Sequence, residues 1–396
     1  MEKTLIFVRS ELYSRFKGSN NKKTGFSGYI YDKMLFESVK GFYTDIFICG
    51  VANEGWWPKL SRHFFIQGER SSRRSISASF INLPVIRDFL ISKNLFTKIK
   101  KHFFSELSVR REINIIVCNP SLSLLFLSKK MKILMPHAKI ILAVPDLPQF
   151  ANTKRDILYL LFKKRIQNRA LEISAKYIDG FVFLTKYMVP IFNKSGKPYI
   201  ISEGISRKIA DYVENKQNRK TIVYTGETSD HYSNIDTLLN SYALVRQKIP
   251  DAKLIIAGNG NNNKYLLKKA SEIGFVYKGL VSPEESLMLQ KNADLLVSLR
   301  KNSPIFKYSF PSKILSYLST GNPLLTIKLD SYPDIYDQVL SYPDSESCSD
   351  ISKKMIFLLN LCESDRKEKW IKTKNILEQS GTEATGKKVL ELFNSL

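Results

Sequence analysis

The sequence is poor in the residues that build metal centres and disulfide frameworks. Its 396 residues include four cysteines and four histidines, and no two cysteines form a C-x-x-C pair. This scatter argues against a zinc site and against a disulfide framework, and it fits a reducing cytoplasm. The sequence also contains no H-E-x-x-H motif and no P-loop, and no Ser-His-Asp arrangement can be defended. The common metalloprotease, nucleotide hydrolase and triad hydrolase patterns are therefore missing.

Long apolar segments are missing as well. The N-terminus offers only the run Thr4–Val8 before Arg9, which is too short for a signal peptide. No stretch approaches 18 apolar residues, so a membrane-spanning helix is not expected. The chain does have 43% hydrophobic and 12% aromatic residues, which is ample for globular folding. Its length favours two domains of about 200 residues each.

Acidic residues are scarce in the first half of the chain. Residues 1–200 hold 34 Lys and Arg against 14 Asp and Glu, a net charge of +20, which leaves +4 of the total +24 for residues 201–396. Two stretches, 89–104 and 157–173, mix basic residues with Phe, Leu and Ile, as basic amphipathic helices at a membrane interface do. Alternatively, their apolar stripes face the core and their lysines are merely solvated. The charge also fits a nucleic-acid-binding protein, but no recognised binding module accompanies it.

The second half alternates apolar runs with helical patterns, which predicts a parallel sheet with helices on both faces. Ligands bind such sheets beyond the carboxyl ends of the strands. The predicted strands are Thr221–Thr225, Lys253–Ala257, Val276–Tyr277, Asp294–Leu299 and Leu324–Ile327. The predicted helices are Ile235–Ile249, Lys264–Ile273, Glu284–Asn292 and Ser312–Thr320.

The first half alternates more loosely and predicts a second α/β domain, so we expect domains at 1–202 and 220–396. The polar, strand-free segment 203–219 is the expected linker, with a hinge between about residues 200 and 220. The predicted strands of the first domain are Thr4–Val8, Asp45–Cys49, Ile113–Cys118, Lys139–Val144 and Gly180–Leu184, and the first predicted helix runs through Ile30–Val39.

The stretch FKYSFPSKILSYLSTGNPLL, residues 306–325, predicts a helix that begins next to an anion site. Ser309 is the expected cap and Pro311 the first helical residue, whereas Gly321 ends the helix. Ser312 and Lys313 then stand at the helix N-terminus, where free N–H groups, the helix dipole and a lysine together favour an anion. Alternatively, Lys313 is a solvated surface lysine.

Five motifs in register resemble the family 4 glycosyltransferases. They are YTGETSDHYSNIDTLLNSYALV, KLIIAGNG, VYKGLVSPEES, ADLLVSL and YSFPSKILSYLSTGNPLL. The last resembles the subgroup that builds bacterial capsular polysaccharides and exopolysaccharides, through its Phe-Pro-Ser-Lys signature. VPDLPQF (144–150) and IDGFVFLTKYM (178–188) resemble the acceptor domain of that subgroup.

The resemblance implies the GT-B architecture, which consists of two facing Rossmann-like domains with parallel sheets. The C-terminal domain would hold a nucleotide-sugar donor, and the final helix, near Lys387–Leu396, would pack back on the N-terminal domain. The resemblance also implies retaining transfer without an obligatory metal. We therefore expect no cofactor, because the nucleotide-diphosphate sugar is a substrate.

On this resemblance the anion is the diphosphate of the donor. Lys313 would hold it and stabilise charge on the leaving group, and Asp146, after a predicted strand, would serve the acceptor side. Asp146 is equally well explained as a cap of a turn, Glu227 likewise, and His137 as an ordinary loop histidine. The predicted donor-binding residues are Gly226, Glu227, Gly258, Gly260, Arg300, Lys307, Pro311, Ser312, Lys313 and Ser316.

Two positions depart from the family pattern. Many members carry glutamates where this chain has Tyr308 and Ser316, and the second glutamate hydrogen-bonds the ribose of the donor. A serine offers one hydroxyl where a carboxylate accepts from both ribose hydroxyls. The usual Gly-Arg and Lys-Gly phosphate clamp is also missing, and Arg300, Lys301 and Lys307 are the cations available in its place.

The expected activity is transfer of a hexose from a nucleotide-diphosphate sugar to a lipid-linked oligosaccharide in surface polysaccharide synthesis. The alternatives are a non-catalytic partner of another glycosyltransferase, suggested by Ser316, and a nucleic-acid-binding protein, suggested by the charge. We expect a cytoplasmic protein on the inner face of the plasma membrane, in contact with anionic lipid and with other polysaccharide-synthesis enzymes. The side chains expected to insert into the bilayer are Phe96, Phe103, Phe104 and Leu161. The predicted membrane-facing cations are Lys93, Lys98, Lys100, Lys101, Lys163, Lys164 and Arg165.

Overall fold

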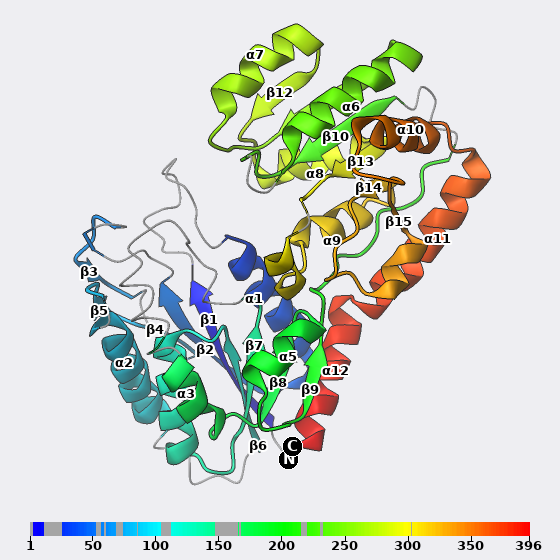
Figure 1. The fold of residues 1–396 in the computed structure, drawn as a ribbon. Helices are drawn as coiled ribbons and strands as arrows, with labels where there is room; N and C mark the ends of the chain where they lie inside the picture. The colour runs from blue at the N-terminus through cyan, green and yellow to red at the C-terminus, as the bar shows by residue number, and fades with distance from the viewer. Residues whose placement is uncertain are drawn as a thin grey trace. The chain divides into compact units, whose positions relative to one another are not determined.

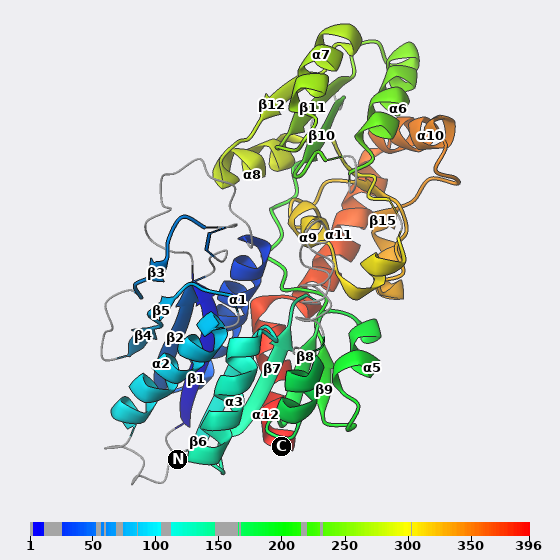
Figure 2. The ribbon, with the colours of Figure 1, turned by 60° about the vertical axis from the view of Figure 1, so that its left-hand side comes forward.

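The chain forms two compact units in the computed structural model (Figures 1 and 2). Unit 1 consists of Met1–Ile205 and Thr382–Leu396, and unit 2 consists of Ser206–Gly381. Each unit is built on its own parallel sheet. The residues that the structure describes are 3–11, 26–52, 57–58, 61–68, 74–84, 86–103, 112–146, 165, 168–214, 220–229, 233–301 and 303–396.

The sheet of unit 1 has seven strands in the order β4-β2-β1-β6-β7-β8-β9, and every pairing is parallel. The central strands are continuous apolar runs whose side chains are buried on both faces, as parallel sheets require. The strands are β1 (Lys3–Glu11), β2 (Asp45–Ala52), β4 (Ser75–Ser77), β6 (Glu112–Cys118), β7 (Lys139–Val144), β8 (Gly180–Phe183) and β9 (Tyr199–Ile201). A separate antiparallel pair joins β3 (Phe65–Ile66) to β5 (Phe80–Ile81).

Helices cover both faces of this sheet. The chain moves outward from β1 to β2 and in the opposite direction from β4 to β6, so right-handed crossovers place α1 (Phe26–Val39) and α2 (Ile86–Phe103) on opposite faces. The helix α3 (Leu122–Leu134) packs beside α2, and α12 (Thr382–Ser395) packs beside α1 (Figure 1).

The packing of α12 on α1 depends on a glycine. A Cβ placed on Gly386 would lie 2.0 Å from the backbone oxygen of Ser38, so the two helices approach more closely than any side chain allows. Val389, Leu392 and Phe393 of α12 are buried in the same unit. The last helix of the chain is thus an integral part of unit 1.

The sheet of unit 2 has six parallel strands in the order β12-β11-β10-β13-β14-β15. The strands are β10 (Thr221–Thr225), β11 (Lys253–Ala257), β12 (Val276–Gly279), β13 (Leu295–Ser298), β14 (Leu324–Thr326) and β15 (Leu340–Ser341). The helices are α6 (Ile235–Lys248), α7 (Asn263–Ile273), α8 (Pro283–Asn292), α9 (Ser312–Leu318), α10 (Cys348–Leu359) and α11 (Glu363–Gln379). Two separate apolar clusters fill the two faces of this sheet.

The strand order of unit 2 reverses between β10 and β13. The chain runs outward from β10 to β12 and then returns to the other side of β10 for β13. Open α/β sheets bind ligands beyond the carboxyl ends of the strands at such a switch point. A ligand-binding site is therefore expected at the loops that follow β10 and β13.

The chain passes between the two units at Ile205–Ser206 and again at Gly381–Thr382. The first passage lies within the segment 203–219, which was expected to be a linker. Part of that segment is nevertheless bound to unit 2. Ser206 pairs with Gly381, the backbone N–H of Ala210 donates to Ser319, and the indole of Trp370 donates to the carbonyl of Ala210 at 3.0 Å. Residues 215–219 lie outside the described residues.

The predicted fold class is confirmed, because both halves are α/β with parallel sheets. Most of the predicted strands and helices match the observed ones within two residues. The short strands β3, β4, β5, β9 and β15 were not predicted, and neither were the helices α3, α5 (Val189–Phe192), α10 and α11.

Candidate anion-binding and active site

Three loops of unit 2 meet at the carboxyl ends of β10, β11 and β12. The backbone N–H of Gly226 donates to Ala257 at 2.8 Å, and that of Gly258 donates to Gly279 at 2.7 Å. Gly258 has a φ of +152°, and a Cβ there would lie 1.7 Å from the backbone oxygen of Gly226. Only glycine permits this contact. The backbones of these loops therefore lie close together at this edge of the sheet.

Lys313 extends from the first turn of α9 onto this edge. Its Nζ lies 3.9 Å from the centre of the Tyr224 ring. It also lies directly against Gly226, where a Cβ would be 2.6 Å from Nζ. A glycine at 226 is therefore needed to admit the lysine. The alternative that Lys313 is a solvated surface lysine does not fit these contacts.

The pKa of Lys313 is lowered to about 7. Burial is the main cause, because it disfavours the charged form, and the nearby guanidinium of Arg300 adds repulsion. The carboxylate of Glu227 acts in the opposite direction and raises the pKa. A bound anion would likewise favour the ammonium form.

Arg300 and Glu227 complete a small group of charges around Lys313. Arg300 follows β13 by two residues, and its guanidinium carbon lies 3.7 Å from the centre of the Phe306 ring, which holds it in place. Glu227 follows β10 and is exposed. Two cations and one carboxylate thus come from the loops on either side of the switch point, together with α9.

A hydrogen-bonded framework fixes α9 against β10. The Tyr317 hydroxyl accepts from the Thr225 backbone N–H at 2.7 Å and donates to its carbonyl at 3.0 Å. Tyr317 is fully buried, and this burial raises its pKa to about 12. These bonds set the position of α9, and hence of Lys313, relative to the strand.

Ser316 belongs to the same framework. Its hydroxyl donates to Oε1 of Gln290 at 2.8 Å, and Nε2 of Gln290 donates to Oγ1 of Thr225 at 2.8 Å. Gln290 is only 5% exposed, so its amide serves these partners inside the unit. The serine that replaces the expected glutamate is therefore already occupied by an internal hydrogen bond.

The start of α9 differs from the prediction. The helix begins at Ser312, Pro311 occupies the cap position, and no side chain caps it. Ser309 instead closes a 3-10 turn, η5 (Pro304–Tyr308), and donates its backbone N–H to Phe306. The predicted Ser309 cap was wrong because Ser309 ends this turn and lies two residues before the cap position, which Pro311 occupies. Gly321 takes a φ of +77° after the helix, as predicted.

The other predicted donor-site residues lie on the same loops. Pro311 is buried and Ser312 exposed at the start of α9, and the backbone N–H of Gly260 donates to Oδ1 of Asn263 at 3.0 Å. Lys307 lies on η5 with its ammonium 5.1 Å from the Tyr308 ring centre. Lys301 is exposed.

The predicted residues of unit 1 are more scattered. Asp146 is exposed two residues after β7, at the carboxyl edge of that sheet, and His137 is exposed in the turn before β7. Lys98 is turned inward, since its ammonium donates to the carbonyl of Ser77 at 2.6 Å. It therefore joins α2 to β4 instead of standing free for a membrane.

The remaining predicted membrane-facing residues divide into two groups. Lys93, Lys100, Lys101 and Arg165 are exposed. Phe96 is half-buried, with the ammonium of Lys130 5.9 Å from its ring centre. The predictions for Phe103, Phe104, Leu161, Lys163 and Lys164 concern side chains outside the described part of the chain.

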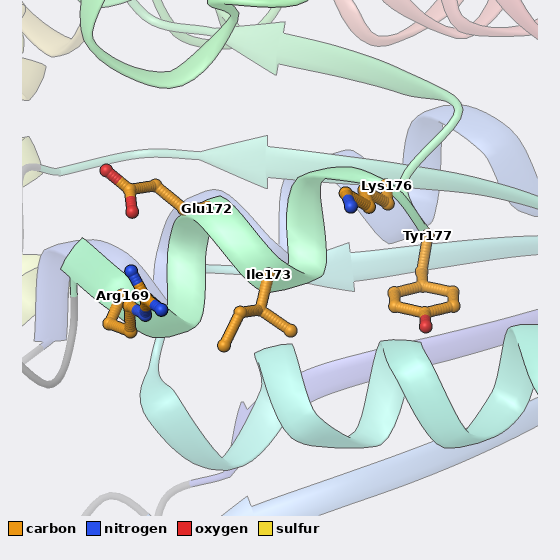
Figure 3. Close-up of a pocket in the computed structure, with 5 residues that line it drawn as sticks. All are labelled: Arg169, Glu172, Ile173, Lys176 and Tyr177. Atoms are coloured by element: carbon orange, nitrogen blue, oxygen red, sulfur yellow. The ribbon is translucent and has the colours of Figure 1, made fainter.

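A shallow hollow of about 270 Å³ lies elsewhere on unit 1. Figure 3 shows its lining along the helical segment 168–175 and the turn after it. The lining residues are Arg169, Glu172, Ile173, Lys176 and Tyr177. None of them was predicted to be functional, and the group offers no chemistry beyond two cations beside one carboxylate. The candidate site therefore remains the Lys313 group of unit 2.

The described residues show neither a metal site nor a membrane span. No three His, Cys, Asp or Glu side chains among them are grouped so that they could hold a metal ion. None of the helices within the described ranges is long and apolar enough to cross a bilayer.

Comparisons with known proteins agree with this geometry. Residues 219–360, which include every strand of unit 2 and the Lys313 group, match the family described as "Glycosyl transferases group 1". No curated protein sequence matches the chain. The fold is similar to the apo form of the lipopolysaccharide outer core galactosyltransferase WaaB, with 14% identity, a TM-score of 0.60 and 99% of each chain covered.

Two further solved structures share the fold. The α,α-trehalose 6-phosphate synthase of Burkholderia multivorans has 8% identity and a TM-score of 0.57, with 100% of this chain and 99% of that chain covered. TarM of S. aureus, in complex with fondaparinux, α-GlcNAc-glycerol and UDP, has 17% identity and a TM-score of 0.51. The match covers 80% of this chain and spans only 60% of TarM.

The fold is therefore GT-B, with one parallel sheet in each unit. Residues 219–360 are similar to the group 1 glycosyltransferases, whose family model they match. The predicted GT-B fold is confirmed and the family match supports the predicted resemblance over these residues, whereas the capsular polysaccharide subgroup remains a prediction.

Sequence reasoning missed the residues that surround Lys313. Tyr224 and Tyr317 look like ordinary core residues of a strand and a helix, and nothing in the sequence indicates that one lies under the lysine. Gln290 carried a weak signal, since it is a polar residue five positions before the apolar strand that begins at Leu295. Its partners come from three different elements and could not be predicted.

Proposed function

We propose that the chain is a retaining glycosyltransferase that moves a hexose from a nucleotide-diphosphate sugar to a lipid-linked oligosaccharide in surface polysaccharide synthesis. The family match of residues 219–360 supports the reaction class. The full coverage of a lipopolysaccharide galactosyltransferase structure supports the fold that such a reaction uses. The hexose, the acceptor and the pathway are part of the proposal.

The observation that carries the proposal is the position of Lys313. The lysine is held over Tyr224 at the switch point of the sheet, with a pKa lowered to about 7 by burial and by Arg300. Charged groups with strongly shifted pKa values gather at functional sites. Two cations that disfavour each other's charge in the free protein are well placed to receive an anion with more than one negative charge.

We assign the diphosphate of the donor to this place. During transfer, a bond forms between an acceptor oxygen and the anomeric carbon, while the bond from that carbon to the diphosphate breaks. Negative charge then develops on the leaving phosphate oxygen. Lys313 and Arg300 would stabilise that charge in a fixed geometry, which is the strongest contribution that a protein makes to such reactions.

The backbone edge around Gly226 and Gly258 supplies the rest of the donor site in this proposal. Because no Cβ fits at Gly258, backbone amides can approach a phosphate or a sugar closely. Glu227 is exposed beside Lys313, where its carboxylate would accept from a sugar hydroxyl. Ser312 would add its hydroxyl to the diphosphate.

Unit 1 is proposed to receive the acceptor. Asp146 stands at the carboxyl edge of its sheet, where α/β units bind ligands, and its carboxylate would accept a proton or a hydrogen bond from the acceptor hydroxyl. A lipid-linked acceptor requires the chain to work at a membrane surface. We therefore propose a cytoplasmic protein that attaches peripherally to the inner face of the plasma membrane.

Titration with nucleoside diphosphates tests the donor site directly. TarM was crystallised with UDP, so UDP is the first ligand to titrate by calorimetry, followed by other nucleoside diphosphates. We expect one of them to bind, and mass spectrometry of the nucleotide released from candidate donors should identify the sugar. A folded protein that binds none of them would contradict the proposal.

Ser316 favours one alternative, a non-catalytic partner of another glycosyltransferase. Its hydroxyl is used by Gln290, so the usual contact with the donor ribose is not available in this arrangement. A purely structural partner has no need to bind nucleotide, so the same titration separates the two proposals. A strong, salt-dependent affinity for DNA would instead support a nucleic-acid-binding function.

A further inference from the structure

The exposed stripe of α2 is apolar at one end and cationic along the rest. Ile86 and Phe89 are 52% and 55% exposed at the start of the helix. The exposed positions that follow are Lys93, Thr97, Lys100 and Lys101. Their spacing of three or four residues places all six positions on one face of the helix.

The opposite face of α2 is an ordinary core face. Ile91, Leu95 and Ile99 are at most 1% exposed. The sequence left two interpretations of this helix open, a core-facing stripe or a membrane-facing one. The structure shows a core-facing stripe and, on another side of the helix, the exposed Ile86 and Phe89.

The helix α3 continues the cationic surface. The ammonium of Lys130 lies 5.3 Å from the centre of the Phe89 ring, so a positive charge stands directly beside the exposed aromatic ring. Lys129 on the same helix lies 5.6 Å from the ring centre of Tyr177. Figure 3 shows Ile173 and Tyr177 of the next segment directed towards a neighbouring helix. Ser174 bonds Leu125 of α3 at 3.2 Å, which identifies that helix.

Acidic residues are nearly missing from this outer layer. Lys and Arg number five in α2, three in α3 and three in residues 165–177. The acidic residues of these segments are Asp88 and Glu172, and Glu172 is 4.0 Å from Lys194. An excess of cations around scattered apolar side chains complements an anionic bilayer.

The β3–β5 pair adds apolar surface at the same end of α2. Phe65 and Ile81 are cross-strand neighbours and are 54% and 37% exposed. The helix α2 begins five residues after Ile81 and packs against β5. The apolar end of the stripe is therefore broader than two side chains.

We propose that the α2 stripe, defined as Ile86, Phe89, Lys93, Lys100 and Lys101 of α2 with Lys130 of α3, docks on an anionic phospholipid bilayer. Ile86 and Phe89 enter the interface, and the lysines lie over the phospholipid headgroups. The inference rests on the proposed function only in that a lipid-linked acceptor gives the docking a purpose. It replaces the predicted contact set, because Lys98 is bound inside unit 1 and Phe96 is half-buried.

Vesicle co-sedimentation tests the stripe. We expect the wild-type protein to bind phosphatidylserine-containing vesicles, to bind phosphatidylcholine vesicles little, and to lose binding steeply as salt is raised. Phe89→Ser combined with Lys93→Gln should weaken binding to anionic vesicles roughly 25-fold, about fivefold for each residue. Lys100→Gln combined with Lys101→Gln is a second variant, on exposed positions that leave the apolar end intact.

Unit 2 offers a matched control. Phe357 is 58% exposed on α10, and the ammonium of Lys354 lies 5.5 Å from its ring centre, as Lys130 lies beside Phe89. Phe357→Ser with Lys354→Gln should leave vesicle binding unchanged. The stripe is refuted if the wild type ignores anionic vesicles, if neutral vesicles bind equally well, or if the folded stripe variants bind like the wild type.

Nucleotide titration of the same variants separates this inference from the proposed function. The stripe variants should bind nucleoside diphosphate like the wild type, because none of the changed residues lies in unit 2. If the protein binds no nucleotide but retains stripe-dependent vesicle binding, the proposed function fails and the docking surface stands. The opposite result removes the docking surface and leaves the transfer reaction.

Discussion

If a nucleotide binds at Lys313 as proposed, the lowered pKa of this lysine makes the binding depend on pH in a defined direction. In the free protein the pKa is about 7, so half of the lysine is neutral at pH 7 and about 99% is neutral at pH 9. A diphosphate beside Nζ favours the ammonium and raises the pKa in the complex. Binding above pH 7 therefore takes up a proton, and affinity falls as the pH rises.

The expected fall is large enough to measure. If the pKa in the complex stays well above 9, the affinity should decrease about 50-fold between pH 7 and pH 9, since the protonated fraction of Lys313 in the free protein falls from about 50% to about 1%. The second ionisation of a phosphate monoester has a pKa of about 6, so the ligand itself changes little in this window. Calorimetry in two buffers of different ionisation enthalpy should report uptake of about one proton at pH 8.5.

Lys313→Met provides the control for this pH profile. The variant should bind nucleoside diphosphate roughly tenfold to a hundredfold more weakly than the protonated wild type, which is the value of one charge-assisted hydrogen bond. Its affinity should not change between pH 7 and 9, so the two curves should converge at high pH. Parallel curves for the two proteins would refute the assignment of the pH dependence to Lys313.

The same variant reports on stability without any ligand. Because the pKa of Lys313 in the folded protein lies below its unfolded value of about 10.5, the folded state binds fewer protons. The lysine therefore destabilises unit 2 fully below pH 7, and this penalty fades as the pH rises towards 10.5. Lys313→Met should raise the melting temperature at pH 6.5 and much less at pH 10.

Three further predictions concern packing and the donor site. Gly386→Val should separate α12 from α1, since even a Cβ would lie 2.0 Å from the Ser38 oxygen, and should lower stability by more than about 2 kcal/mol in thermal unfolding. Arg366→Leu should cost about 2–4 kcal/mol by the same assay, because the buried guanidinium donates to backbone carbonyls of α10 and of Asp294. If Arg366→Lys lowers the stability as little as the substitution of an exposed lysine does, this reason would be contradicted. Ser316→Glu should tighten nucleoside diphosphate binding in calorimetry if the amide of Gln290 turns to donate to the new carboxylate, and unchanged affinity would show that the ribose contact has been rebuilt elsewhere.

The central elements of both units could be predicted because their signal is local. The strand Lys253–Ala257 is an apolar run bounded by polar turns, and the helix Ile235–Lys248 has an apolar stripe at helical spacing. The strands β3, β5 and β15 have two residues each, so they show no periodicity. They exist because a neighbouring segment offers backbone partners, and that information is not local.

The site could be predicted in part for the same reason. The spacing of Pro311, Ser312 and Lys313 indicated a helix start beside an anion, and the lysine does lie at the start of α9. The sequence could not show that Tyr224 lies under Nζ or that Gly226 makes room for it. The prediction that Lys98 faces a membrane failed because it considered the helix alone. The ammonium of Lys98 donates to the carbonyl of Ser77 on β4, and the sequence of the helix does not show this contact.

The two polar groups on either side of α9 differ in a way that bears on whether the chain binds nucleotide. The group around Gln290 is internally satisfied, because the hydroxyl of Ser316 and Oγ1 of Thr225 each have a partner. Such a network stabilises the unit and requires no ligand. The charges around Lys313 behave differently.

Burial disfavours the charge of Lys313, and repulsion by Arg300 adds to this cost. A protein that served only as a structural partner would be more stable with a methionine at position 313, because an apolar side chain of similar length removes both penalties. An anion at this place would instead compensate both cations at once. The arrangement is therefore unfavourable in the empty unit and favourable in a complex, which is the behaviour expected of a nucleotide-diphosphate site and not of a scaffold.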